Sequence, residues 1–138
     1  MIILCLDEFK NEFEKLIRNN SYSSIEIDII EYFFNKNIQE LSSGIRLNNS
    51  DTIPFIKKRI KGRGGYRFYF LLIIKDEKLY LLFVHPKSGS LGFENIADEL
   101  KTALYKKVLE CIKSDNLFAV TVNKEKLIFT KLENVNFT

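Results

Sequence analysis

Two apolar segments that lie close together restrict the fold of this chain more than any other feature. Phe68–Ile74 and Leu79–Val84 consist of aliphatic and aromatic residues, and four charged residues separate them. Apolar runs of this length between turn-forming residues are typical of buried β-strands. We therefore predict a central β-hairpin that starts at Tyr66 and turns at residues 75–78.

Two registers of this hairpin are compatible with the sequence, and they differ in which polar side chains share a face. With a two-residue turn, Arg67 lies on the opposite face of the hairpin from His85 and Lys87. A three-residue loop places Arg67 opposite Lys87 and His85 opposite Tyr69, so that all four share one face. No Asn-Gly or Asp-Gly pair marks a two-residue turn. We therefore prefer the second register.

A strongly basic segment precedes the hairpin. Six of the eleven residues from Lys57 to Arg67 are basic and none is acidic. Phe55–Lys61 predicts a strand with Ile56 and Ile60 on one face and cationic side chains on the other. A basic face on a rigid sheet suits a polyanion, and we expect RNA. The residues expected to contact RNA, by charge or by stacking on bases, are Lys57, Lys58, Arg59, Lys61, Arg63, Tyr66 and Tyr69.

The N-terminal part of the chain predicts one strand and two helices. Ile2–Leu6 is apolar and β-branched, and Asp7 is placed to cap a helix after it. Ser23 and Glu26 have the spacing of a capping box. Apolar residues then recur at helical spacing, so residues 8–43 predict a helical hairpin whose apolar stripe packs on a sheet.

The C-terminal part predicts one helix and a second hairpin. The helix begins at Asn95 or Asp98, carries an apolar stripe and ends at residues 114–116. Leu117–Val122 and Lys126–Leu132 then alternate as strands do. No linker or repeat interrupts the chain, so residues 1–138 are expected to form one α+β domain.

Composition limits the cellular setting. The formal net charge is only +3, from 21 basic and 18 acidic residues, so the basic middle segment is a local feature. Cys5 and Cys111 lie in apolar segments and are expected to be buried thiols that form neither a disulfide nor a metal site. The sequence shows neither a signal peptide nor an apolar run of roughly 20 residues, so we expect a cytoplasmic protein without membrane contact.

The residues from 56 to 88 resemble a known family. The basic strand, the glycine turn followed by Tyr66 and Arg67, the apolar hairpin and the segment His85-Pro86-Lys87-Ser88 resemble the RelE/ParE superfamily, toxins of type II toxin–antitoxin systems, and most closely its RelE-like branch. The resemblance covers roughly residues 1–110. It implies an α+β fold, with an antiparallel sheet of about four to six strands on which an N-terminal helical hairpin and a further C-terminal helix pack.

The resemblance also implies an activity. RelE-like toxins are mRNA endoribonucleases, many of them ribosome-dependent, and they inhibit translation and arrest growth. Cleavage by attack of the 2′-OH needs a base, an acid and positive charge near the phosphorus, and no metal or cofactor. Arg67 matches the arginine that would stabilise that charge, His85 fits an acid–base position, and Lys87 matches a basic residue at the end of the strand. The expected partners are a cognate antitoxin, which would form a heterotetramer with the toxin, mRNA and the ribosome.

Two alternatives remain open at this point. The tyrosine near the C-terminus of several RelE members has no secure counterpart, because Tyr105 falls inside a predicted helix. A ParE-like toxin would bind DNA gyrase without cleaving RNA and would not need His85 or Lys87. An unrelated basic protein would bind nucleic acid without chemistry, through salt-sensitive contacts to phosphates.

Overall fold

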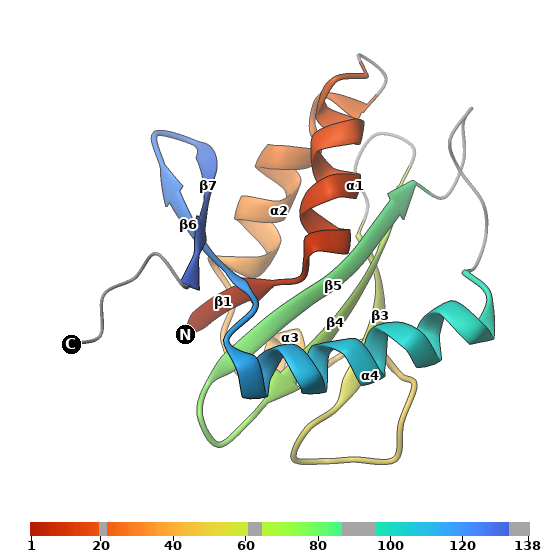
Figure 1. Ribbon diagram of the computed structural model, residues 1–138. Helices are drawn as coiled ribbons and strands as arrows, with labels where there is room; N and C mark the ends of the chain where they lie inside the picture. The colour runs from red at the N-terminus through yellow and green to blue at the C-terminus, as the bar shows by residue number, and fades with distance from the viewer. Residues whose placement is uncertain (20–21, 61–64, 87–95, 133–138) are drawn as a thin grey trace.

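The computed structural model describes residues 1–19, 22–60, 65–86 and 96–132, and these form a mixed α+β structure around one sheet (Figure 1). Its seven strands follow the order β2-β3-β4-β5-β1-β6-β7. The strands are β1 (Ile2–Cys5), β2 (Ile45–Arg46), β3 (Phe55–Ile60), β4 (Tyr66–Ile73), β5 (Lys78–Pro86), β6 (Phe118–Asn123) and β7 (Lys126–Lys131).

The predicted sheet was nearly correct in content but wrong in two details. The seventh strand is β2, whose two residues are too few to give a periodic pattern. The sheet is also not wholly antiparallel, because β1 lies between β5 and β6 and pairs in parallel with β5. The antiparallel sheet of four to six strands is thus replaced by a seven-stranded, mostly antiparallel sheet.

Helices cover both faces of this sheet. They are α1 (Asp7–Ile17), α2 (Ile25–Phe33), the short α3 (Ile38–Leu41) and α4 (Asp98–Ser114). In Figure 1, α1 and α2 lie on one side of the sheet and α4 lies on the other. The apolar stripe of α1 packs on one core, and Leu104 and Val108 of α4 belong to a second core across the sheet. No described helix is long and apolar enough to cross a membrane.

The predicted helix starts required correction. Leu6, not Asp7, occupies the N-cap position of α1, and Asp7 is the first helical residue. Ser24 precedes α2 without a capping hydrogen bond from its side chain. The capping box is instead at α3, where Asn37 and Glu40 satisfy each other's backbone N–H groups, so the predicted second helix is divided in two.

Glu26, expected in a capping box, instead anchors the C-terminal hairpin to α2. Its carboxylate accepts a hydrogen bond of 2.9 Å from the backbone N–H of Leu127 and lies 3.4 Å from Lys126 Nζ. Lys124 and Glu125 both have positive φ, as a two-residue type I′ turn requires. The predicted hairpin is therefore confirmed, and it is held at its turn by a helix from the N-terminal part of the chain.

Neither register considered for the central hairpin was right. Arg67 pairs with His85, whereas Ile73 pairs with Lys78, because the register shifts between Tyr69 and Phe70. A β-bulge of this kind adds one residue to one strand, and the alternation pattern cannot reveal it. Directly paired residues lie on the same face, so Arg67 and His85 do share a face, as the preferred register required.

Gly44 allows β2 to approach β3 closely. A Cβ atom at this position would lie 2.5 Å from Cγ2 of Ile56 and 2.8 Å from the carbonyl oxygen of Lys57. Both distances are shorter than nonbonded atoms tolerate, and the carbonyl belongs to a strand that cannot easily move. The absence of a side chain at Gly44 thus brings β2 against the basic strand.

We predict that Gly44→Ala destabilises the protein. The added methyl group has to push β2 away from β3 or displace Ile56, which we expect to cost about 1–3 kcal/mol. Urea unfolding of the two proteins measures this difference. Ile45→Ala, which removes a 61% exposed side chain from the adjacent position, should have a much smaller effect. Equal stability of Gly44→Ala and wild type would contradict the close approach.

Candidate nucleic-acid interface

Basic side chains from two adjacent strands meet on the face of the sheet that α4 covers. In the β3–β4 pair, Arg59 lies directly opposite Arg67 and Lys57 lies opposite Tyr69. On the other side of β4, Arg67 lies opposite His85 of β5. Three neighbouring strands therefore place Arg59, Arg67 and His85 in one row. The alternation of β3 predicted the common face of Lys57 and Arg59, and strand pairing adds Arg67 to it.

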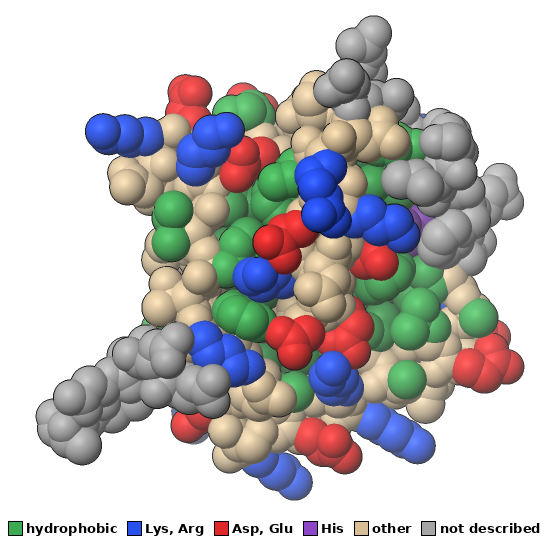
Figure 2. Space-filling model, turned by 45° about the horizontal axis from the view of Figure 1, so that its top comes forward, with side chains coloured by type: hydrophobic (Ala, Val, Ile, Leu, Met, Phe, Trp, Pro, Cys, Tyr) green, Lys and Arg blue, Asp and Glu red, His purple; other side chains and the backbone are tan. Residues whose placement is uncertain are grey.

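These side chains line a depression at the end of β2, which we name the basic pocket. Its volume is about 370 Å³, and its lining consists of Ser43, Gly44, Ile45, Lys57, Lys58, Arg59 and Arg67. Every charged residue in this described lining is basic. Arg59 is exposed, while Lys57, Lys58 and Arg67 are half-buried. On the face of the molecule in Figure 2, by contrast, basic and acidic side chains are interspersed.

The pairing of Arg59 with Arg67 opposes folding. Like charges placed directly opposite each other on a sheet repel and lower stability. Arg59 makes no ion pair with a carboxylate within the described ranges. The guanidinium of Arg59 is consequently available to an anion, and an arginine can offer two N–H groups to one phosphate.

The surroundings of Lys57 change its affinity for a proton. Burial lowers the pKa of Lys57 below its usual value of 10.5, and the positive charges of Arg67 and of Lys101 on α4 lower it further. Both causes disfavour the protonated amine. A lowered pKa increases the fraction of the Lys57 amine that is unprotonated near neutral pH. Because only the unprotonated amine can accept a proton, Lys57 is a better candidate for a base than an ordinary surface lysine.

His85 is enclosed at the other end of the row. Its side chain is 1% exposed, its ring stacks on Tyr69 at 5.9 Å between centroids, and Phe83 lies at 6.2 Å. Nδ1 lies 3.0 Å from the carbonyl oxygen of Pro86, which can only accept, so Nδ1 carries the proton of this hydrogen bond. The predicted acid–base role of His85 would therefore require the ring to be uncovered.

The remaining residues predicted to contact RNA or to act in catalysis fall into three groups: buried tyrosines, a lysine on the other face of β3, and residues outside the described ranges. Tyr66 and Tyr69 are fully buried, in the cores on opposite faces of the sheet, so the expected stacking of bases on these rings does not fit the structure. Alternation points the side chain of Lys58 away from those of Lys57 and Arg59. Lys61, Arg63 and Lys87 lie outside the described residues.

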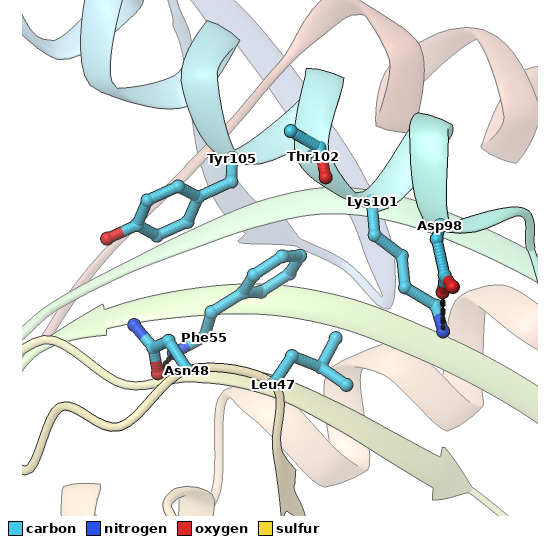
Figure 3. Close-up of a pocket in the computed structure, with 7 residues that line it drawn as sticks. All are labelled: Leu47, Asn48, Phe55, Asp98, Lys101, Thr102 and Tyr105. Atoms are coloured by element: carbon cyan, nitrogen blue, oxygen red, sulfur yellow. Dashed lines mark hydrogen bonds and ion pairs between the residues drawn. The ribbon is translucent and has the colours of Figure 1, made fainter.

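A second depression lies two residues further along β3 from the basic pocket, where Phe55 instead of Lys57 belongs to the lining. It lies between the loop after β2 and helix α4, has a volume of about 390 Å³, and is shown in Figure 3. Tyr105 stacks against Phe55 with 5.6 Å between ring centroids and 20° between planes. We name it the aromatic pocket; its lining is Leu47, Asn48, Phe55, Asp98, Lys101, Thr102 and Tyr105.

Asn48 fixes the loop that forms one wall of the aromatic pocket. Its side-chain oxygen accepts a hydrogen bond of 2.9 Å from the backbone N–H of Phe55, and its side-chain nitrogen donates one of 2.9 Å to the carbonyl of Ile53. The four lining residues of α4 occur at helical spacing, which was the only sequence signal for this site. Their partner Phe55 is too distant in sequence for any spacing rule to connect it with them.

Other site types find no support in the described part of the chain. Its His, Cys, Asp and Glu side chains nowhere gather in a group of three or more that could hold a metal ion. The predicted buried, unpaired thiols are confirmed for Cys5 and Cys111. No protein-family model matches the chain, and no curated protein matches it significantly. The resemblance to the RelE/ParE superfamily therefore stays a prediction from the motif.

We predict that Arg59→Gln stabilises the fold. Removing one of two directly opposed positive charges should raise the free energy of unfolding by about 0.2–1 kcal/mol at low salt. The gain should shrink as salt is added, because ions screen the repulsion. Urea unfolding at two salt concentrations measures both effects, with Lys106→Gln on the exposed side of α4 as the control. A loss of stability in Arg59→Gln would refute the opposed-charge arrangement.

We also predict that His85 makes folding sensitive to acid. Burial lowers the pKa of His85 below 6.5, and the charges of Arg67 and Lys57 lower it further, whereas the hydrogen bond to Pro86 opposes the shift. The unfolded state then binds the proton more tightly than the folded state. The stability that this difference contributes is present above the pKa of His85 in the unfolded state. It is lost as the pH falls through that value toward the lower pKa of His85 in the folded state.

The measurement is the urea midpoint between about pH 7.5 and pH 5, a range that contains the ordinary histidine pKa of roughly 6.5. His85→Phe keeps an aromatic ring but cannot titrate, so its midpoint should fall less over this range than that of wild type. Identical pH profiles would show that His85 does not resist protonation in the folded protein.

Proposed function

We propose that this chain binds the phosphate backbone of RNA in the basic pocket and cleaves the strand, acting as the mRNA endoribonuclease toxin of a toxin–antitoxin pair. The observation that carries the proposal is the direct pairing of Arg59 with Arg67 beside Lys57, in a pocket whose charged lining residues are all basic. Such a cluster costs stability in the free protein, and a bound phosphate would offset the repulsion.

The same residues suit transfer of the phosphoryl group to the 2′-oxygen. Lys57, with its lowered pKa, would take the proton of the attacking 2′-OH. Arg67 would hold the non-bridging oxygens as negative charge develops on them, because its guanidinium stays protonated. The 5′-oxygen then leaves as a hydroxyl once it receives a proton. His85 and Lys87 were the expected acid–base groups at this step. That assignment remains part of the proposal, and for His85 it requires that the ring be uncovered when RNA binds.

The wider setting is also proposed, not observed. A toxin that cleaves mRNA harms its own cell unless it is inhibited, so a cognate antitoxin is the expected protein partner. Action on mRNA at the ribosome would take place in the cytoplasm. Both statements depend on the resemblance of residues 56–88 to RelE-like toxins.

One observation favours a second candidate function. The only histidine of the chain is 1% exposed, and an enclosed imidazole cannot exchange protons with a substrate. A protein that only binds RNA would use the basic pocket in the same way and would need no acid–base group. Binding without cleavage would therefore make this chain an RNA-binding protein.

We predict that Arg67→Ala weakens binding to a short single-stranded RNA by about tenfold. The slope of the logarithm of the binding constant against the logarithm of the salt concentration should decrease in magnitude by about one. Lys57→Met should lose cleavage to a greater extent than binding, because it removes the proposed base. Fluorescence anisotropy measures binding. Mapping of mRNA 5′ ends in a translation extract measures cleavage with ribosomes present.

Lys106→Ala is the matched control, since this exposed lysine of α4 lies outside the basic pocket. Cleavage by wild type that persists in Lys57→Met would remove Lys57 from the mechanism. Binding without new 5′ ends would favour the second candidate. Failure of folded wild-type protein to bind RNA at any salt concentration would reject both functions.

A further inference from the structure

The basic pocket and the aromatic pocket occupy successive positions on the same two strands. In the β2–β3 pair, Ile45 lies opposite Lys57, and both line the basic pocket. Beyond the Arg46–Ile56 pair, Leu47 lies against Phe55, and the N–H of Leu47 donates a hydrogen bond of 2.7 Å to the carbonyl of Phe55. Both residues line the aromatic pocket. Two residues along a strand span about 6.8 Å.

This separation suits one nucleotide, whose phosphate and base can occupy two neighbouring depressions. Lys101 lines the aromatic pocket, and its positive charge helps to lower the pKa of Lys57 in the basic pocket. A strand held by its phosphate in the basic pocket would therefore have a base within reach of Phe55 and Tyr105. This step depends on the RNA-binding function proposed above.

The aromatic pocket offers an apolar wall with polar groups at its mouth. Figure 3 shows Phe55 of β3 and Tyr105 of α4 pointing toward each other, so that their rings meet, with Leu47 near Phe55. Phe55 is nearly buried and forms the floor, whereas Tyr105 is half-buried and keeps part of its ring accessible. Bases stack on such partly accessible aromatic rings in many RNA-binding proteins.

The polar groups at the mouth combine a donor and an acceptor. Lys101 Nζ lies 3.4 Å from Oδ1 of Asp98, and both residues line the pocket. Lysine can only donate and an ionised aspartate can only accept. Guanine presents acceptors at O6 and N7 and donors at N1 and N2, so its edge matches this pair. Adenine offers its amino donor where guanine has the O6 acceptor.

We propose that the aromatic pocket is a nucleobase subsite that takes one guanine of the bound RNA. The base stacks on Tyr105, its N1–H and N2–H groups donate to Asp98, and Lys101 donates to O6. Asp98 is 94% exposed and Lys101 21% exposed, so both can turn toward a ligand without disturbing the core. The basic pocket then supplies affinity, and the aromatic pocket supplies preference for one base.

The test uses five short RNAs, U-U-N-U-U, in which N is guanine, adenine, cytosine, uracil or an abasic ribose. We expect wild type to bind the guanine RNA about tenfold more tightly than the adenine RNA, in line with the discrimination of one good base contact. Asp98→Asn should abolish this ratio, because an amide cannot accept from two donors as a carboxylate does. Tyr105→Leu should lower the affinity for every base-containing RNA toward the affinity for the abasic RNA.

Glu99→Gln is the matched control, because it removes the same charge from the adjacent position of α4 without lining the aromatic pocket. The guanine-to-adenine ratio, and not the absolute affinity, is the readout, since removal of any acidic residue near the basic pocket should tighten binding generally. Asp98 and Glu99 are both exposed, so neither change is expected to impair folding.

The outcomes separate this inference from the proposed function. A guanine preference that disappears in Asp98→Asn and persists in Glu99→Gln supports it. Equal binding of all five RNAs, with affinity still lost in Arg67→Ala, would overturn the subsite and leave RNA binding in place. Preference for another base, or a guanine preference that survives in Asp98→Asn, would also overturn it. If no RNA binds, the proposed function fails and the subsite fails with it.

Discussion

The burial of β4 and β5 on both faces is the constraint on which the rest of the structure depends. Alternate residues of these two strands belong to the core beneath α1 and α2 and to the core beneath α4. A sheet strand covered on both sides has no solvent face, so its sequence is continuously apolar. Arg67 and His85 interrupt this pattern only near the ends of the strands, and the polar site lies where the apolar layers stop.

The sequence predicted most strands and helices because their periodicity follows from burial. It failed where one local interaction decided the outcome. The bulge between Tyr69 and Phe70 shifts the register without changing the apolar pattern, and the capping box at Asn37 divides a helix whose apolar stripe seemed continuous. Two residues of β2 carry no periodicity at all. In each case the residue types are compatible both with the predicted structure and with the structure that forms.

The candidate site was predictable only in part, for the same reason. The common face of Lys57 and Arg59 follows from alternation within one strand. The enclosure of His85 depends on its ring contacts with Tyr69 and Phe83. The register that brings these rings together is set by the bulge. The contact of Phe55 with Tyr105 joins a strand to a helix through the tertiary fold. Charge patterns were thus readable from the sequence, whereas the shape of the pockets required the structure.

The position of β1 has a consequence for how the protein reaches its folded state. Ile2 pairs with Lys78 and Leu4 pairs with Ala119, so both neighbours of β1 are synthesised long after β1 itself. Contacts so distant along the chain slow folding, because long loops have to close before the contacts form. On the ribosome, β1 therefore has no strand to pair with until β5 has been synthesised. The sheet is completed only when the C-terminal hairpin has left the exit tunnel.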